Sequence, residues 1–217
     1  LEEDLKNIAS NHVLFNDLKN STILITGATG LIGSYLIKSI VCCNQINATN
    51  IKVIALIRSN DKAREIFKEI YDNNMIHFIV TDITNELDID YEIDYIVHGA
   101  SPTASKFFIT NPVETIDAIV LGTKNILELS RKNSVKGFVY LSTMEVYGIT
   151  DPELERVSES DLGYIDILSV RSSYSEGKRM AENLCIAYAD QYGIDVKIAR
   201  LAQTFGAGIQ KTENRVF

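Results

Sequence analysis

The chain has 217 residues, of which 46% are hydrophobic and 23% charged, with 12 glycines and 3 prolines. This composition is that of a folded protein with one sizeable core, and it excludes collagen-like, low-complexity and disordered classes. Its 21 lysines and arginines against 29 aspartates and glutamates give a net charge of -8, which repels nucleic acid and anionic membranes. We therefore expect neither as a partner.

The cysteines and histidines argue against several kinds of site. Cys42, Cys43 and Cys185 form no CxxC pair, so neither a disulfide framework nor a zinc motif is indicated, and the scattered histidines predict no metal. No apolar run reaches the roughly 18 to 20 residues of a membrane span, and the N-terminal sequence opens acidic. We expect no anchor or signal peptide, and a cytoplasmic protein.

Short β-branched runs alternate with helical stretches from residue 21 onwards. We expect strands at 21–26, 51–57, 77–80, 95–97, 138–141 and 196–201. The helices expected between them span about 31–43, 61–73, 112–133 and 174–192. Such alternation buries parallel strands between two layers of helices, so the predicted fold class is α/β, a doubly wound parallel sheet of the Rossmann type.

Three glycines occur three residues apart where the first strand passes into the first helix. The segment reads Thr26-Gly27-Ala28-Thr29-Gly30-Leu31-Ile32-Gly33. Glycines let the backbone approach a pyrophosphate closely, and a helix N-terminus offers free amides to it. The motif predicts a dinucleotide site at residues 27–33, with a purely structural glycine turn as the alternative.

Further candidate cofactor contacts follow the second, third and fourth strands. Arg58 stands where an acidic residue would bind the ribose of NAD, so it favours NADP unless it is simply a solvated side chain. Asp82 and Ile83 follow the third strand, where a loop could reach the adenine, although Asp82 could instead cap a turn. Ala100 and Ser101 follow the fourth strand and would line the cofactor, with an ordinary tight turn as the alternative.

Catalytic candidates come from the fifth strand and the last helix. Tyr174 and Lys178 are four residues apart on one helical face, where a cation favours the phenolate that a general base needs. Thr143 and Glu145 follow the fifth strand, at the carboxyl end where ligands of α/β sheets bind. We expect Thr143 to bond a substrate oxygen shared with Tyr174, unless it only caps the strand. Glu145 would face the same substrate, unless it only orders the loop.

Together, the segments TGATGLIGS, HGAS, STMEVYG, YSEGK and RLAQTFG resemble the extended short-chain dehydrogenase/reductase family, in its NAD-dependent epimerase/dehydratase group acting on nucleotide sugars. Residues 171–182 look most like those of UDP-glucuronate decarboxylases. The resemblance covers residues 21–208.

This resemblance implies a division of the chain. It places an NAD(P)-binding Rossmann domain at residues 21–206. From the residue pattern itself, the polar and weakly periodic residues 144–173 are expected to form a substrate loop over the edge of the sheet, and residues 1–20 a lead-in segment with a short helix. Residues 207–217 would begin a C-terminal substrate region, so that most of the small substrate-binding lobe is absent.

The resemblance also implies a role for each site residue. Tyr174 is then the base, Lys178 its activator and a ribose ligand, and Thr143 the hydroxyl partner. The expected sugar contacts are Ser101, Thr143, Glu145 and Gln203. Ile119 and Gln203 replace asparagines that are common in the family. NAD as cofactor and a homodimer are further implications.

The residues after Thr143 separate the candidate reactions. Sugar 4,6-dehydratases typically carry Asp at the position of Met144, so dehydration is disfavoured. Glu145 stands where decarboxylases resembling this chain also have a Glu. We expect a lyase or isomerase that works through a transient 4-keto sugar, with decarboxylation ahead of 4-epimerisation. The alternatives are an NADPH-dependent ketone or sugar reductase and a non-catalytic dinucleotide-sensing module.

Overall fold

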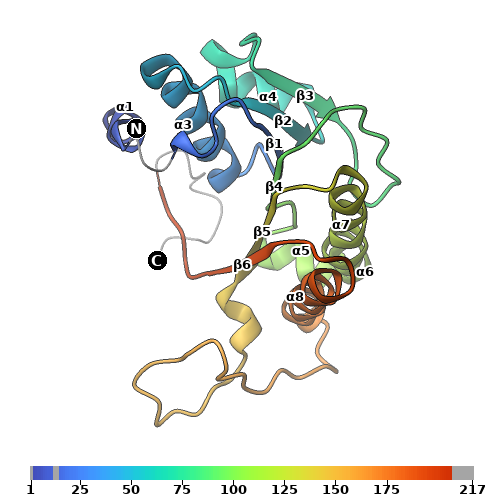
Figure 1. Ribbon diagram of the computed structural model, residues 1–217. Coiled ribbons are helices and arrows are strands. Elements are labelled where there is room, and N and C mark those ends of the chain that lie inside the picture. The colour runs from blue at the N-terminus through green and yellow to red at the C-terminus, as the bar shows by residue number, and fades with distance from the viewer. Residues whose placement is uncertain (1, 12–14, 207–217) are drawn as a thin grey trace.

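The computed structural model describes residues 2–11 and 15–206, which form a six-stranded sheet between two layers of helices (Figure 1). The strands are β1 (Thr22–Thr26), β2 (Lys52–Ile57), β3 (Ile76–Val80), β4 (Tyr95–His98), β5 (Gly137–Thr143) and β6 (Val196–Leu201). Their order is β3-β2-β1-β4-β5-β6, and every neighbouring pair is parallel. The predicted doubly wound parallel sheet is confirmed. The expected start of a C-terminal substrate region, residues 207–217, lies outside the described residues.

Each face of the sheet carries its own helices and its own core (Figure 1). One layer consists of α1 (Glu2–Ser10), α3 (Leu31–Asn47), α4 (Asn60–Phe67) and the 3-10 turn η1 (Lys68–Ile70). The other consists of α5 (Ser105–Thr110), α6 (Pro112–Ile116), α7 (Gly122–Asn133) and α8 (Ser172–Tyr192). Leu24 and Ile25 of β1 show the division, because successive strand residues point to opposite faces and these two belong to different cores. In the described part of the chain, no helix has the length and apolarity to cross a membrane.

The N-terminal helix α1 packs on α3. Ala9 is fully buried, and its carbonyl accepts a 2.6 Å hydrogen bond from Asn47 Nδ2 near the end of α3. The contacts of α1 are therefore with the glycine-turn half of the sheet rather than with the half that holds α8.

The long helix expected at 112–133 is present, but it is not uniformly α-helical, because a π-helical turn, η2 (Asp117–Leu121), lies between α6 and α7. An extra residue in one turn changes the apolar spacing too little to be recognised in the sequence. Ile119 of this turn is 1% exposed and packs against Gly177 of α8, where an added Cβ atom would lie 3.4 Å from Ile119 Cδ1. The absence of a side chain at Gly177 lets α8 lie close to η2, one turn beyond Tyr174.

A long segment connects β5 to α8. It begins with a 3-10 turn, η3 (Met144–Tyr147), and then projects beyond the sheet as an irregular loop (Figure 1). The base of the loop is closed by a bridge in which Ile149 and Tyr164 exchange two backbone hydrogen bonds of 2.9 and 3.1 Å. Residues 151–160, beyond this bridge, are all exposed.

Arg179 of α8 fixes both ends of this loop. Its guanidinium donates hydrogen bonds to the carbonyls of Val146 and Gly163, each at 2.7 Å. Gly163 has no room for a side chain, because an added Cβ would lie 1.9 Å from the Ile149 carbonyl oxygen. The loop therefore enters and leaves next to η3, so its base is held beside the residues that follow β5.

Candidate functional site

The sheet reverses its winding between β1 and β4, which pair directly with Thr26 opposite His98. In parallel sheets ligands bind beyond the carboxyl ends of the strands at such a switch point. The segments that follow β1, β4 and β5 all leave the sheet at this edge. The fold thus brings together residues 27–33, 99–101 and 143–145, of which the first and last segments are more than a hundred positions apart in the sequence.

The glycine turn is packed too tightly for side chains. Gly27 has φ of +68°, and a Cβ there would lie 2.7 Å from the Gly99 carbonyl oxygen. At Gly33 an added Cβ would lie 2.4 Å from the carbonyl oxygen of Gly27, and at Gly30 3.1 Å from it. Because α3 begins at Leu31, the amides of its first turn lack helical acceptors and stay available to an anion. This glycine cradle, whose backbone packing leaves no room for Cβ atoms and whose helix-end amides are free, fits a pyrophosphate.

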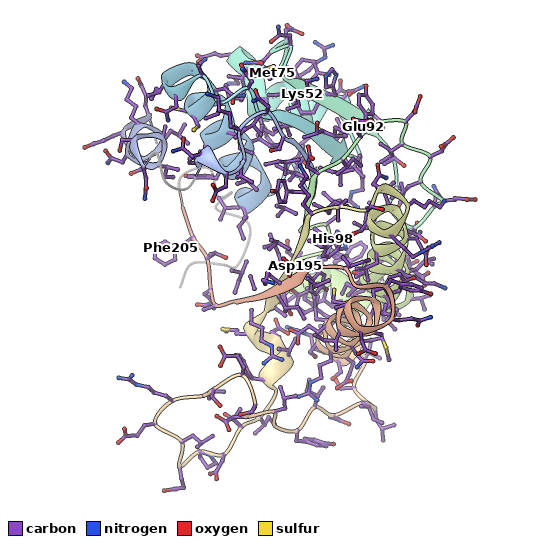
Figure 2. All side chains as sticks on the ribbon, in the orientation of Figure 1. Lys52, Met75, Glu92, His98, Asp195 and Phe205 are labelled. Carbon is purple, nitrogen blue, oxygen red and sulfur yellow. The ribbon has the colours of Figure 1, made fainter. Side chains whose placement is uncertain are left out.

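A buried hydrogen-bond chain holds the two strands that flank the switch point. Thr26 Oγ1 accepts bonds from the amides of Gly99 and Ala100 at 3.1 and 3.0 Å, so its own hydrogen is left for His98 Nδ1 at 2.6 Å. His98 must then carry its hydrogen on Nε2, which lies 3.0 Å from Thr123 Oγ1 of α7. Burial lowers the pKa of His98 to about 3, so the ring is neutral. His98, between the sheet and α7 in Figure 2, is a structural tie.

Tyr174 and Lys178 lie on the buried face of α8, with 8% and 3% of their surfaces exposed. Lys178 Nζ donates a 2.9 Å hydrogen bond to the carbonyl of Leu141 in β5. The ring of Tyr174 stacks on that of Phe108 of α5, with centroids 4.2 Å apart and planes 7° apart. Burial lowers the pKa of the Lys178 ammonium to about 8. A phenol and a cation are therefore held together at the edge of β5.

Glu145 is joined to Tyr174 through two intermediate side chains. Both oxygens of its carboxylate are bound by Arg171, with N–O distances of 2.9 Å each. The Arg171 guanidinium also lies over the Phe108 ring, 4.9 Å from its centroid, and the same Phe108 ring stacks on the ring of Tyr174. The order Glu145, Arg171, Phe108, Tyr174 thus forms one continuous stack that fixes a carboxylate relative to a phenol.

Sequence reasoning assigned no role to Phe108 or Arg171. Arg171 precedes Tyr174 by three residues, a spacing of nearly one helical turn, and this was a usable signal. Phe108 is 66 positions from Tyr174 in a short helix, and no pattern in the sequence connects the two rings.

Thr143 ends β5 and caps η3. Its Oγ1 accepts a 3.2 Å hydrogen bond from the Glu145 amide, which is the strand-capping role considered as an alternative. The hydroxyl hydrogen is not used in this bond, because the oxygen is the acceptor. Thr143 can therefore cap the turn and still donate to a ligand.

An ion pair behind the site ties α8 to β6. Arg200 Nη2 lies 2.8 Å from Glu182 Oε2, and the Ser142 hydroxyl donates to the same carboxylate at 2.5 Å. Arg200 also donates to the Glu159 carbonyl in the projecting loop at 2.7 Å, and its guanidinium lies 5.0 Å from the Tyr147 ring centroid. This pair is absent from the sequence interpretation because its members lie on separate elements.

The other candidate cofactor residues, Arg58, Asp82 and Ile83, follow β2 and β3. Arg58 is exposed after β2. Asp82 accepts bonds from the amide and hydroxyl of Thr84 at 2.9 and 2.8 Å, which lowers its pKa and caps a turn. The Ile83 side chain is buried against Gly122, and its carbonyl accepts a 2.9 Å hydrogen bond from Asn125 Nδ2.

Three other expected contacts occupy loops at the carboxyl edge. The Ala100 amide bonds Thr26, and the Ser101 hydroxyl donates to the Pro102 carbonyl at 3.0 Å. Gln203 is exposed in the segment that follows β6. In the described residues no cluster of three histidine, cysteine or acidic side chains is placed to hold a metal ion.

A doubly wound sheet with a glycine turn at its switch point defines the class of Rossmann-like proteins. The NAD dependent epimerase/dehydratase family matches residues 23–217, so the chain belongs to this family. The family resemblance drawn from the motifs is confirmed.

Two curated relatives of the chain are UDP-glucuronic acid decarboxylases. The chain is 36% identical over 197 residues to UDP-glucuronic acid decarboxylase 6 of Arabidopsis thaliana, a match that covers 91% of this chain and 54% of that protein. It is 34% identical over 194 residues to UDP-glucuronic acid decarboxylase 1 of Xenopus tropicalis, covering 89% and 44%. The chain thus spans about half the length of the curated relatives it matches.

Solved structures with the same fold include a UDP-glucuronic acid 4-epimerase from Bacillus cereus in complex with UDP-glucuronic acid and NAD. That structure matches with a TM-score of 0.67 at 25% identity, over 82% of this chain and 55% of that one. A dTDP-glucose 4,6-dehydratase from Bacillus anthracis in complex with NAD matches with a TM-score of 0.65 at 25% identity, over 83% and 54%.

Proposed function

We propose that this chain is the dinucleotide-binding part of an enzyme that modifies a nucleotide sugar through a transient 4-keto sugar, with decarboxylation of a sugar acid ahead of 4-epimerisation. The observation that carries this proposal is the stack that fixes Glu145 relative to Tyr174. The similarity to UDP-glucuronic acid decarboxylases supports it.

The glycine cradle supports NAD as the cofactor, as in the two solved relatives. We assign the pyrophosphate to residues 27–33, the adenine to Asp82 and the Ile83 backbone, and the nicotinamide half to Ala100, Ser101, Tyr174 and Lys178. Arg58 is the single feature that favours NADP, because an exposed cation after β2 suits a 2′-phosphate.

When bound, the dinucleotide accepts a hydride from C4 of the sugar and returns it. The chain's own residues manage the proton and the geometry. Tyr174 takes the proton of the C4 hydroxyl as a general base, while the Lys178 ammonium favours the phenolate. Thr143 donates to the same oxygen. Ser101 and Gln203 are the proposed additional sugar contacts.

The 4-ketone makes a C5 carboxylate the acid group of a β-keto acid. The bond between C5 and the carboxyl carbon then breaks, carbon dioxide leaves, and the electron pair passes into the enolate, which takes a proton from water at C5. Glu145 orients the sugar acid for this loss, and its own charge is balanced by the ion pair with Arg171. Arg171 keeps Glu145 in the required place.

Two alternatives differ in what they require. An NADPH-dependent reductase needs Arg58 to bind a 2′-phosphate, so Arg58→Ala would weaken NADP and leave NAD unchanged. A non-catalytic dinucleotide sensor needs the glycine cradle alone. The buried Tyr174 and Lys178 pair and the stack to Glu145 favour the catalytic proposal over the sensor.

The experiment is to offer the full-length protein a panel of UDP-, dTDP- and GDP-linked sugars and sugar acids, with NAD or NADP. We expect the absorbance of the reduced dinucleotide to rise transiently with a UDP-linked hexuronic acid, and mass spectrometry to detect loss of carbon dioxide. Failure of every member of the panel to change the absorbance contradicts the nucleotide-sugar proposal. Net, stoichiometric consumption of reduced cofactor favours the reductase.

We also propose a homodimer in the cytoplasm. Helices α6 and α8 expose apolar side chains on the outer layer, namely Val113, Ile116, Met180 and Ile186. The three cysteines are free thiols, which suits a reducing compartment. Light scattering at micromolar concentration should give twice the monomer mass, and Met180→Glu together with Ile186→Glu should give the monomer.

A further inference from the structure

Lys178 is a buried cation without a counter-ion. It is 3% exposed, and no carboxylate in the described part of the chain lies within ion-pair distance of its Nζ. The nearest acidic side chain of α8, Glu182, is already bound by Arg200 and Ser142. A charge removed from water in this way is costly unless other groups compensate it.

The groups that face the ammonium come from β4, β5 and α8. The direct hydrogen bond is from Nζ to the Leu141 carbonyl at 2.9 Å. The Tyr140 ring lies beneath the ammonium with its centroid 4.8 Å away, and the Tyr174 ring is more distant at 5.9 Å. The titratable neighbours are His98, Tyr140, Tyr174, Glu182 and Cys185.

Among these groups Tyr140 is the ring that lies closer to the ammonium. It is 1% exposed, and its hydroxyl lies near that of Thr123 but makes no hydrogen bond of acceptable geometry within the described residues. Burial raises the pKa of the Tyr140 phenol, so the ring is neutral and presents its electron-rich face. The ring face, and not the hydroxyl, is therefore what this residue offers to Lys178.

We propose that Tyr140 is a positioning residue for Lys178, whose ammonium it holds charged and directed at the carboxyl edge of β5 through a cation–π interaction. The inference rests on the function proposed above in that Lys178 is taken to act on Tyr174. It goes further by assigning a core residue of β5 to the tuning of that cation. A buried cation–π contact is strong enough to shift a lysine titration by about 0.4 to 1.5 pH units.

The test is direct titration of Lys178 in the full-length protein by NMR of its ¹³Cε signal, assigned from the spectrum of Lys178→Arg. Tyr140→Phe keeps the ring and removes the unbonded hydroxyl, so the midpoint should stay within about 0.2 pH units of wild type. Tyr140→Leu removes the ring, so the midpoint should fall by about 0.4 to 1.5 pH units. Phe138→Leu removes a buried ring two residues earlier on the same face of β5 and should not move it.

A second variant keeps the aromatic ring and changes its electron density. Replacing Tyr140 by 3,4,5-trifluorophenylalanine withdraws electrons from the ring face and should lower the midpoint relative to Tyr140→Phe. Equal midpoints for these two rings, or equal shifts for Tyr140→Phe and Tyr140→Leu, overturn the inference.

The outcome separates this inference from the proposed function. If the Lys178 midpoint depends on the ring at position 140 in a protein that transforms no nucleotide sugar, the inference is supported and the proposed function is refuted. A titration indifferent to the ring, in a protein that does transform one, refutes the inference alone.

Discussion

Arg171 binds both carboxylate oxygens of Glu145, at 2.9 Å each, while its guanidinium lies over the Phe108 ring. About a third of each charged side chain is exposed, with values of 35% for Arg171 and 33% for Glu145. An ion pair in such contact with water adds at most about 1 kcal/mol to stability. Its effect must therefore be geometric, because the planar Arg171 guanidinium fixes the Glu145 carboxylate and the Phe108 ring fixes the guanidinium.

Arg171→Lys is expected to lower turnover by about ten- to a hundredfold while leaving the affinity for the dinucleotide nearly unchanged. Lysine keeps the charge but loses the bidentate geometry and the flat contact with Phe108. Steady-state kinetics with the preferred sugar acid and calorimetric titration with NAD measure the two quantities.

Arg131→Lys is the matched control for this change. Arg131 also pairs with a glutamate, Glu128, and lies over a ring, that of Tyr192. Tyr192 is 18 residues beyond Tyr174 on α8, about 27 Å along the helix. Equal effects of the two substitutions would mean that the position of Arg171 near Glu145 has no special consequence.

Tyr174→Phe should keep the stack with Phe108, because the ring remains, and so leave folding and dinucleotide binding intact. Turnover should fall by about 10²- to 10⁴-fold, the contribution of a general base. Thermal melting tests folding, titration with NAD tests dinucleotide binding, and steady-state kinetics test turnover. Tyr164→Phe, an exposed tyrosine of the projecting loop, is the control. A variant with wild-type turnover would exclude Tyr174 as the base.

Gly33→Ala should abolish measurable binding of the dinucleotide and lower stability by about 1 to 3 kcal/mol, because the added Cβ meets the Gly27 carbonyl at 2.4 Å. Gly193→Ala is the comparison, since Gly193 has φ of +71° but nothing within 4 Å of an added Cβ. It should cost about 1 kcal/mol in stability through backbone strain and leave the affinity unchanged. Normal NAD affinity in Gly33→Ala would place the cofactor elsewhere.

His98 should make the protein sensitive to acid. Its pKa is about 3 in the folded protein, against an ordinary value of 6.5, so the unfolded chain binds a proton between these values that the folded chain does not. The contribution of His98 to the free energy of unfolding is fully present above pH 6.5. It falls by up to about 1.4 kcal/mol per pH unit as the pH drops towards 3. His98→Asn should flatten the plot of unfolding free energy against pH over this range, measured by urea denaturation.

The comparison variant for this pH effect is His77→Asn, since His77 is a partly exposed residue of β3. Its plot should keep the wild-type slope. A wild-type slope in His98→Asn would show that other groups govern acid denaturation.

The sequence was most informative where a pattern is local. Alternating β-branched runs and helices predicted the six strands and their parallel arrangement, and the glycine spacing located the tight turn after β1. Lys178 follows Tyr174 by about one helical turn, so the two side chains lie on the same face whether the helix begins at 174, as predicted, or at Ser172, as observed.

What the sequence did not reveal depends on contacts between distant segments. Phe108 between Arg171 and Tyr174, and Glu182 paired with Arg200, are brought together by the sheet and not by spacing. The π turn at η2 escaped notice because its residues are as helical in composition as their neighbours. Tyr140 has the pattern of an ordinary core residue, and its contact with Lys178 depends on how α8 lies across β5.

In the proposed mechanism Glu145 acts after the sugar is oxidised at C4, and Glu145→Gln tests this role most directly. In a rapid-mixing experiment the full-length variant, loaded with NAD, is mixed with UDP-glucuronic acid, and reduced-dinucleotide absorbance and carbon dioxide are followed together. We predict that the absorbance rises as in wild type, while release of carbon dioxide slows by about 10²-fold or more. Equal slowing of both signals, accompanied by a lower melting temperature, would contradict the claim and leave Glu145 as a residue that only orders the loop.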